Sequence, residues 1–349
     1  MKKIQRIAAL LLAVVLVVVA GCSAGSSPKQ ALQDSMTKMI DVDSYSAKIS
    51  FGFDELELPA DASSEELMQY TMIANMLKNA KLNVNAVYQK EPMRTDMELS
   101  VVVSGMTITI PMILNEKKLY VKIPAIPMLN LPPTISDKFI EIDIEALAAQ
   151  QESSASLDIA AQQKFGQELS AILLKHFDEK TYFSEVKAED ASLPEGLKVD
   201  RIVRFSVDES NYEKSVEMIV NKLLPELIDV LATNEAYLQS AQTTKEEVTQ
   251  MKTDLETNKA EVLDVLKNNV KVIELSLIGG IKDKYLEYQA GKLNVMYTDK
   301  ESGQSLKLGV HYDAQYSDIN KAPKFENELP TDAVKFEELM QQLQMPTGL

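Results

Sequence analysis

The sequence contains no tryptophan, one cysteine and two histidines, and each scarcity excludes a class of function. Without tryptophan, and with 12 glycines in 349 residues, the chain offers neither a lectin-like site nor a glycine-loop nucleotide site. A single cysteine cannot form an intramolecular disulfide, and a lone free thiol is unusual in an exported protein. These scarcities direct attention away from catalysis and toward binding.

The two histidines, His176 and His311, do not form a recognisable catalytic motif. A Ser/His/Asp site needs a histidine base that is held by a third group, and the sequence pattern assigns no such group to either residue. We expect both at the surface, His176 late in a helix and His311 on the polar face of a strand. Without a constellation for acid, base or nucleophile, we predict that the protein is not an enzyme.

Adjacent acidic residues are the other candidates for a catalytic or metal site. Paired carboxylates serve glycosidases and bind calcium, but none of these pairs has EF-hand spacing, and neighbouring acids on helices and turns are usually solvated. We therefore predict no metal and no cofactor. The pairs are Asp54 with Glu55, Glu65 with Glu66, and Asp178 with Glu179.

Positive charge is also in short supply, because 36 Lys and Arg face 52 Asp and Glu, for a formal net charge of −16. A surface this acidic is repelled by nucleic acid and by anionic lipid headgroups. The composition is otherwise that of a globular protein, with 45% apolar and 25% charged residues. We therefore predict no nucleic-acid partner, and any membrane attachment requires an anchor.

The N-terminus provides such an anchor. Lys2, Lys3 and Arg6 precede an uncharged apolar run over residues 7–20, which is the pattern of a secretory signal peptide. The run is about 14 residues long, shorter than the roughly 20 that a helix needs to cross a bilayer. A permanent transmembrane helix is therefore the weaker interpretation.

Residues Val19, Ala20, Gly21 and Cys22 resemble the lipobox of bacterial lipoproteins. The resemblance implies a diacylglyceryl group on Cys22, acyl chains such as palmitate, and cleavage that removes residues 1–21. The formal charge then changes from −16 to −19, because three positive charges are lost. Residues 22–28 predict a short flexible tether. The alternative is an ordinary secretory signal with a chance cysteine.

Apolar and polar residues alternate with period two through much of the remaining chain, which predicts a sheet with one buried face. Two glycines at positions 279 and 280 are expected to end one strand, and turns are expected at 104–105, 290–291 and 299–303. About eleven strands are predicted, over residues 45–53, several between 82 and 123, 139–143, 199–207, 270–278, 284–289, 292–298 and 305–312.

Helical spacing of apolar residues occurs between the strands. Capping-box pairs at Ser63 and Glu66 and at Thr244 and Glu247 predict two helix starts. The pattern indicates a single α+β domain over residues 29–349, a large curved antiparallel sheet or half-barrel with helices on one face. The predicted helices cover residues 29–40, one following Ser63, insertions near 144–180 and 211–268, and 333–343.

The order of these elements resembles the LolA-like lipoprotein group that includes the mycobacterial LppX and LprG proteins. The motifs SYSAKISF at 44–51, LYVKIP at 119–124 and ELPTDAVKFEEL at 328–339 also resemble uncharacterised lipoproteins of Gram-positive bacteria. The resemblance implies a half-barrel whose apolar concavity, between sheet and helices, holds acyl chains. No binding residue is transferred from the group, because no motif matches residue by residue.

Methionine is abundant, with 16 in the chain, and its flexible thioether suits an adaptable lipid pocket. Adjacent strands predict a shared apolar face, which is a candidate ligand-binding wall, although core packing explains the same pattern. Its predicted members are Met97, Leu99, Val101, Met106, Ile108, Ile110 and Met112.

From these observations we predict a non-enzymatic lipoprotein, anchored to the extracytoplasmic face of the cell membrane, that binds an apolar or amphipathic ligand such as a lipid or glycolipid. The alternative is a structural or sensor lipoprotein that contacts another envelope protein. An enzyme ranks third.

Overall fold

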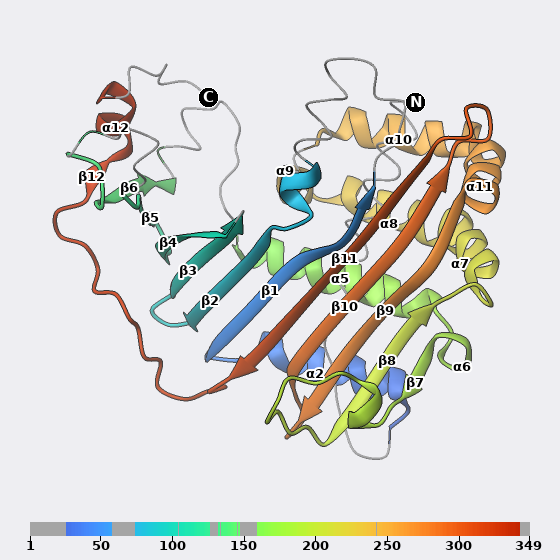
Figure 1. Cartoon of the computed structure of the whole chain (residues 1–349), viewed down its shortest axis with the longest axis horizontal. Coiled ribbons are helices and arrows are strands. Elements are labelled where there is room, and N and C mark those ends of the chain that lie inside the picture. Colours follow the sequence, from blue (N-terminus) through green and yellow to red (C-terminus); the bar gives the residue numbers. More distant parts are fainter. Residues whose placement is uncertain are drawn as a thin grey trace. The chain divides into compact units, whose positions relative to one another are not determined.

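Twelve strands form one open sheet in the order β12-β6-β5-β4-β3-β2-β1-β11-β10-β9-β8-β7 (Figure 1). The structure is a computed structural model, and it describes residues 26–57, 74–103, 105–125, 132, 134–144, 146, 159–241 and 243–342. Because the first and last strands in this order are β12 and β7, the sheet is not closed into a barrel. With several helices beside a mostly antiparallel sheet, the predicted α+β class is confirmed.

The strands range from two to fourteen residues. Their bounds are β1 Ser44–Glu57, β2 Lys81–Gln89, β3 Arg94–Val103, β4 Met106–Asn115, β5 Lys118–Lys122, β6 Phe139–Asp143, β7 Phe183–Glu185, β8 Arg201–Val207, β9 Val270–Lys282, β10 Tyr285–Thr298, β11 Ser305–Ser317 and β12 Val334–Lys335.

None of the described helices is long and apolar enough to cross a membrane. The helices are α2 Pro28–Ile40, α5 Ile159–His176, α6 Glu179–Tyr182, α7 Tyr212–Met218, α8 Leu224–Thr233, α9 Glu235–Ser240, α10 Lys245–Thr257, α11 Lys259–Asn268 and α12 Phe336–Gln342, with a π-helical turn at Ile219–Leu223 and a 3-10 turn at Ala188–Asp190.

The prediction that Gly279 and Gly280 end a strand is wrong, because both lie inside β9. Glycine occupies both positions because neighbouring side chains leave no room for a Cβ atom. A Cβ on Gly279 would lie 2.6 Å from Leu32 Cδ1, and one on Gly280 would lie 3.0 Å from Tyr288 Cβ. The turn instead falls on Asp283 and Lys284, whose φ values of 49° and 69° suit a two-residue hairpin.

The predicted turn at residues 290–291 is also wrong, because β10 runs through it without interruption. Gly291 sits beneath an aromatic ring, and its missing Cβ would lie 2.1 Å from Tyr312 Cε1. Two predicted strands therefore merge into one. The short strands β7 and β12 were not predicted, which explains why eleven expected strands became twelve.

The chain divides into two compact units. Unit 1 comprises residues 1–41, 53–78 and 158–313, and unit 2 comprises residues 42–52, 79–157 and 314–349. Strands β1 and β11 contribute residues to both units. We describe each unit separately.

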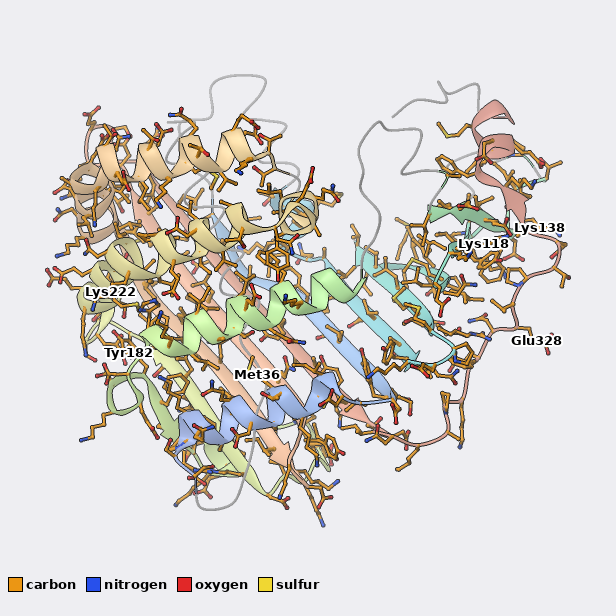
Figure 2. All side chains as sticks on the ribbon, turned by 180° about the vertical axis from the view of Figure 1, so that it is seen from behind. Met36, Lys118, Lys138, Tyr182, Lys222 and Glu328 are labelled. Carbon is orange, nitrogen blue, oxygen red and sulfur yellow. The ribbon has the colours of Figure 1, made fainter. Side chains whose placement is uncertain are left out.

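In unit 1, helices cover one face of strands β8 to β10 (Figure 2). One core cluster joins Leu32 and Met36 of α2 and Leu173 of α5 to Val203 and Phe205 of β8, and all five are buried. On α2 the predicted apolar face is otherwise confirmed at Leu32 and Met36, but Ile40, at its last residue, is 39% exposed. A second cluster joins α7, α8, α10 and α11.

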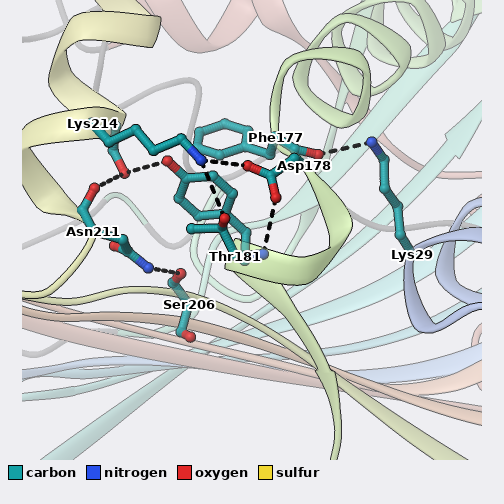
Figure 3. Close-up of polar contacts among 9 residues, drawn as sticks. Lys29, Phe177, Asp178, Thr181, Ser206, Asn211 and Lys214 are labelled. Carbon is teal, nitrogen blue, oxygen red and sulfur yellow. Dashed lines mark hydrogen bonds and ion pairs between the residues drawn. The ribbon is translucent and has the colours of Figure 1, made fainter.

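Polar contacts tie the same helices together (Figure 3). Lys29 of α2 donates to the Phe177 carbonyl at 2.8 Å. Lys214 of α7 reaches Asp178 Oδ2 at 2.7 Å, and Asn211 donates to the Ser206 carbonyl at 3.3 Å. These bonds satisfy groups where chain segments cross, so they fix the helices against β8.

The helical insertion at 211–268 divides as predicted, at Thr233 and before Thr244. The capping box is confirmed, because Thr244 Oγ1 accepts from the Glu247 amide at 3.2 Å and Glu247 Oε2 accepts from the Thr244 amide at 3.2 Å. The π-helical turn ends two residues before Pro225, which lacks the amide proton that a regular helix would use there. The capping pair at residues 63 and 66, and most of the first insertion before 159, lie outside the described residues.

Two glycine substitutions should have opposite effects on stability. Gly291→Ala places a methyl group against the Tyr312 ring, so we expect a loss of about 1–3 kcal/mol in the free energy of unfolding. Gly166→Ala in α5 meets no atom within 4 Å, so we expect a gain of up to about 1 kcal/mol from helix propensity. Urea unfolding measures both, and equal stability of Gly291→Ala and wild type would contradict the close packing.

Candidate functional site

The seven predicted ligand-binding residues lie together on one face of unit 2. Cross-strand partners in an antiparallel pair share a face, and β3 and β4 pair Met97 with Met112, Leu99 with Ile110, and Val101 with Ile108. Met106 pairs with Val103 at the hairpin end of the same face. The structure therefore brings all seven together, as the alternation predicted.

Strands β1 and β2 extend this face, which the sequence analysis did not assign to the site. Leu82, Val84 and Ala86 of β2 pair with Val101, Leu99 and Met97. The signal was present as period-two alternation in both strands. We call the combined surface the apolar stripe, which comprises Ala47, Ile49, Phe51, Leu82, Val84, Ala86, Met97, Leu99, Val101, Ile108, Ile110 and Met112.

The apolar stripe is only partly covered. Six of the seven predicted residues are half-buried, and Met106 is 53% exposed. Helix α12 packs at the β6 end of unit 2, where Leu339 joins Ile135 and Ile140 in a small core. No described helix packs extensively on β2, β3 or β4. The predicted concavity between sheet and helices is therefore not formed by described helices at these residues.

The opposite face of the same strands is more polar, and it is buried at one end. There Asp96, Ile113 and Tyr120 lie in register across β3, β4 and β5, and they are 4%, 0% and 7% exposed. Farther along this face Lys48, Asn85 and Thr107 are exposed, so the burial is local.

Residues 318–333, which we call the C-terminal segment, contact this polar face. Arg94 makes a bidentate ion pair with Asp96, with N···O distances of 2.7 and 3.0 Å. The Arg94 guanidinium lies 4.1 Å from the centre of the Phe325 ring and donates to the Asn327 carbonyl. The Asn327 amide in turn donates to Asp96 Oδ2 at 3.2 Å. Asp96 is thus buried with its charge paired and hydrogen-bonded.

Three tyrosines lie beside one end of the apolar stripe. Tyr45 and Tyr88 pair across β1 and β2, two residues from stripe positions 47 and 86, with ring centres 5.0 Å apart. Tyr316 of β11 meets Tyr45 edge-on at 5.5 Å. Burial, reinforced by the neighbouring hydroxyls of Tyr316 and Tyr88, raises the pKa of Tyr45 to about 12. The stripe therefore has a chemically distinct end that carries hydroxyl groups.

The two histidines have separate carboxylate partners. His176 Nε2 lies 2.7 Å from Glu226 Oε2, and its side chain is 12% exposed, so its predicted surface position is wrong. Hydrogen bonds from Lys175 and then His176 lower the pKa of Glu226. His311 Nδ1 lies 2.8 Å from Asp54 Oδ1 with a side chain 40% exposed, as predicted.

The described acidic pairs make ion pairs with bases. Lys307 lies 3.3 Å from Glu55 Oε1, and Lys214 lies 2.7 Å from Asp178. Among the described residues, no three His, Asp or Glu side chains are grouped as metal ligands. Cys22, the signal segment 1–21, and the acids at 65 and 66 lie outside the described residues.

No family model matches the chain, and no curated protein matches it. Among solved structures, a lipovitellin described as "lipid-protein interactions in lipovitellin" is similar over 82% of this chain, with 7% sequence identity and a TM-score of 0.22. The chain spans 26% of that lipovitellin chain. At this TM-score the likeness carries no argument about fold or ligand.

Buried tyrosines should make the protein less stable in alkali. Burial raises the pKa of Tyr45, Tyr212 and Tyr288 to about 12, against an ordinary value of about 10. The raised pKa favours the folded state fully below pH 10, and this contribution is lost as the pH rises toward 12. We expect a loss of up to about 1.4 kcal/mol per pH unit for each such tyrosine.

Absorbance titration of phenolate tests this expectation. The folded protein should show a late component near pH 12 that urea unfolding moves to about 10, and Tyr45→Phe should reduce that component. If all phenolates of the folded protein ionised together near pH 10, the burial of these hydroxyls would be refuted.

Proposed function

We propose that this chain is a membrane-anchored envelope lipoprotein that binds an apolar or amphipathic ligand, a lipid or acyl chain, on the apolar stripe of unit 2. It would be attached through acylated Cys22 to the extracytoplasmic face of the membrane, and would belong with the LolA-like group. Binding would bury hydrocarbon without making or breaking a bond. The observation that carries the proposal is the half-exposed apolar face of β1 to β4, on which no described helix packs extensively.

The dimensions of the stripe support an acyl ligand. From Met97 to Val103 one face of β3 spans six residue steps, or about 20 Å at roughly 3.4 Å per residue. A bilayer leaflet has a hydrocarbon thickness of about 15 Å, half of the roughly 30 Å core, so the stripe is long enough for most of one acyl chain. Each methylene buried there contributes about 0.8 kcal/mol, and half-buried Met97 and Met112 provide flexible contact surface.

Chemistry elsewhere in the chain is consistent with binding rather than catalysis. The helices of unit 1 enclose tightly buried cores, and several of their polar groups, such as Lys29 and Lys214, are engaged in contacts that hold the fold. The half-exposed stripe is a continuous apolar surface of unit 2 whose coverage the described helices leave incomplete. A lipid ligand would complete that coverage.

Leu99→Asp should abolish lipid binding. The charge would lie in the centre of the stripe, opposite Ile110, where bound hydrocarbon would have to cover it. We expect the affinity for a fluorescent fatty acid to fall at least about tenfold, which corresponds to about 1.4 kcal/mol. Native mass spectrometry after gentle purification should show a lipid adduct on the wild type and none on this variant.

Ser100→Asp is the matched control, since it adds the same charge one residue along β3 but on the opposite face, where Ser100 pairs with Thr109. It should retain lipid binding. Equal binding by both variants, or a wild type that carries no adduct and takes up no probe, would contradict the proposal.

Cys22→Ser should remove the anchor. The wild type is expected to partition into detergent and to carry a diacylglyceryl mass on its N-terminal cysteine, because two acyl chains hold a protein stably on a membrane. The variant should carry no added acyl mass. Unmodified cysteine in the cell-derived wild type would refute lipidation while leaving the stripe proposal standing.

A further inference from the structure

The β3–β4 hairpin contains an unusually long stretch without charge. Residues 99–114, sixteen in a row, include no Asp, Glu, Lys or Arg, although 25% of the chain is charged. A stretch of this length at the average composition would contain four charges. The end of the hairpin away from its turn does carry charge, because Arg94, Asp96 and Glu98 lie in the first half of β3.

The hairpin tip, defined as residues 101–103 and 106–108, lacks charge on both faces of the sheet. One face carries Val101 and Ile108, which belong to the apolar stripe, and the pair Val103 and Met106, which continues it. On the other face Val102 pairs with Thr107. A surface hairpin in water normally has one polar face, so this tip does not follow the rule for a solvated hairpin.

One pair of hydroxyl side chains next to the tip is paired internally. Ser100 Oγ and Thr109 Oγ1 lie 3.2 Å apart, and the β3–β4 register continues to the Val103 and Met106 pair. Gly105, with φ at +79°, allows the tight turn. Internal pairing lowers the cost of removing these groups from water. Even so, Met106 is 53% and Leu82 is 38% exposed.

We propose that the hairpin tip inserts into the interface of a lipid bilayer, beside the apolar stripe, so that the stripe opens toward the lipid from which its ligand comes. The part of this inference that concerns the ligand rests on the proposed function. The contact between the hairpin tip and the bilayer does not depend on it. The occupant is the uncharged acyl boundary of the membrane, because a chain with net charge −16 gains nothing from anionic headgroups and the tip has no cation to bind them.

The pairing of β4 limits the depth of insertion. Strand β5 pairs only with Met112, Ile113 and Leu114. Within the described part of the chain, the outer edge of residues 106–111 therefore has no strand partner. Unpaired backbone groups are not tolerated in the hydrocarbon centre, so the tip lies at the headgroup and acyl boundary, where water still reaches that edge.

Because the chain contains no tryptophan, the fluorescence of a single introduced tryptophan reports on its own position alone. Thr107→Trp puts a single tryptophan at the exposed tip, on the face away from the apolar stripe, and Glu116→Trp puts one at the exposed turn at the opposite end of β4. The full chain is mixed with phosphatidylcholine vesicles whose acyl chains are brominated. We expect a blue shift and quenching for Thr107→Trp and neither for Glu116→Trp.

Charge variants of Thr107→Trp complete the test. Adding Val102→Asp should abolish the quenching, because Val102 is the tip partner of position 107. Adding Asn115→Asp, which introduces the same charge at the strand base, should leave the quenching intact. Equal quenching at positions 107 and 116, or a vesicle-independent blue shift that grows with protein concentration, would overturn the proposal, the latter in favour of a second copy of the chain.

The two proposals fail separately. Leu99→Asp should abolish probe uptake in solution while Thr107→Trp remains quenched by vesicles. Val102→Asp should do the reverse, because its side chain lies on the face opposite the stripe. Loss of vesicle quenching alone would remove the membrane contact, and loss of probe uptake alone would remove the ligand site.

Discussion

The alternation of side chains along paired strands is the constraint on which the rest of this structure depends. Once β1 to β4 pair in register, every second residue shares one face, and a slip of one position would exchange the faces. The sheet therefore has two surfaces that the chain must cover, pair or leave to another molecule. Each unit meets this requirement differently.

Unit 1 covers its apolar sheet face with helices, and close packing explains two of its strand glycines. Gly279 accommodates Leu32 of α2, and Gly291 accommodates the Tyr312 ring. Unit 2 instead buries a polar patch at one end of its strands, where the C-terminal segment shields Asp96 with Arg94 and Asn327. Its apolar stripe remains half-exposed, because no described helix packs extensively on β2, β3 or β4.

This difference between the two units bears on both proposed activities, lipid binding and membrane contact. Under the proposed function, an acidic chain held at a membrane by acyl groups would have no electrostatic attraction to the surface, so contact beyond the anchor would be apolar. The stripe would provide a surface for hydrocarbon, the tyrosines at one end would provide hydroxyl groups, and the uncharged tip at the other end would provide a route to the bilayer. Ligand binding and membrane contact would then use adjoining parts of one β-hairpin.

Periodicity and turn chemistry in the sequence determined the fold class, the meander of unit 2, the capping box at Thr244 and the shared face of Met97, Leu99 and Ile110, because these follow from local spacing. Tertiary structure alone decided that Gly279 and Gly291 lie inside strands, since their reason is a neighbour distant in sequence. It also decided that His176 is mostly buried against Glu226. Above all, it decided that Asp96 is buried, because that depends on a segment more than two hundred residues away in sequence.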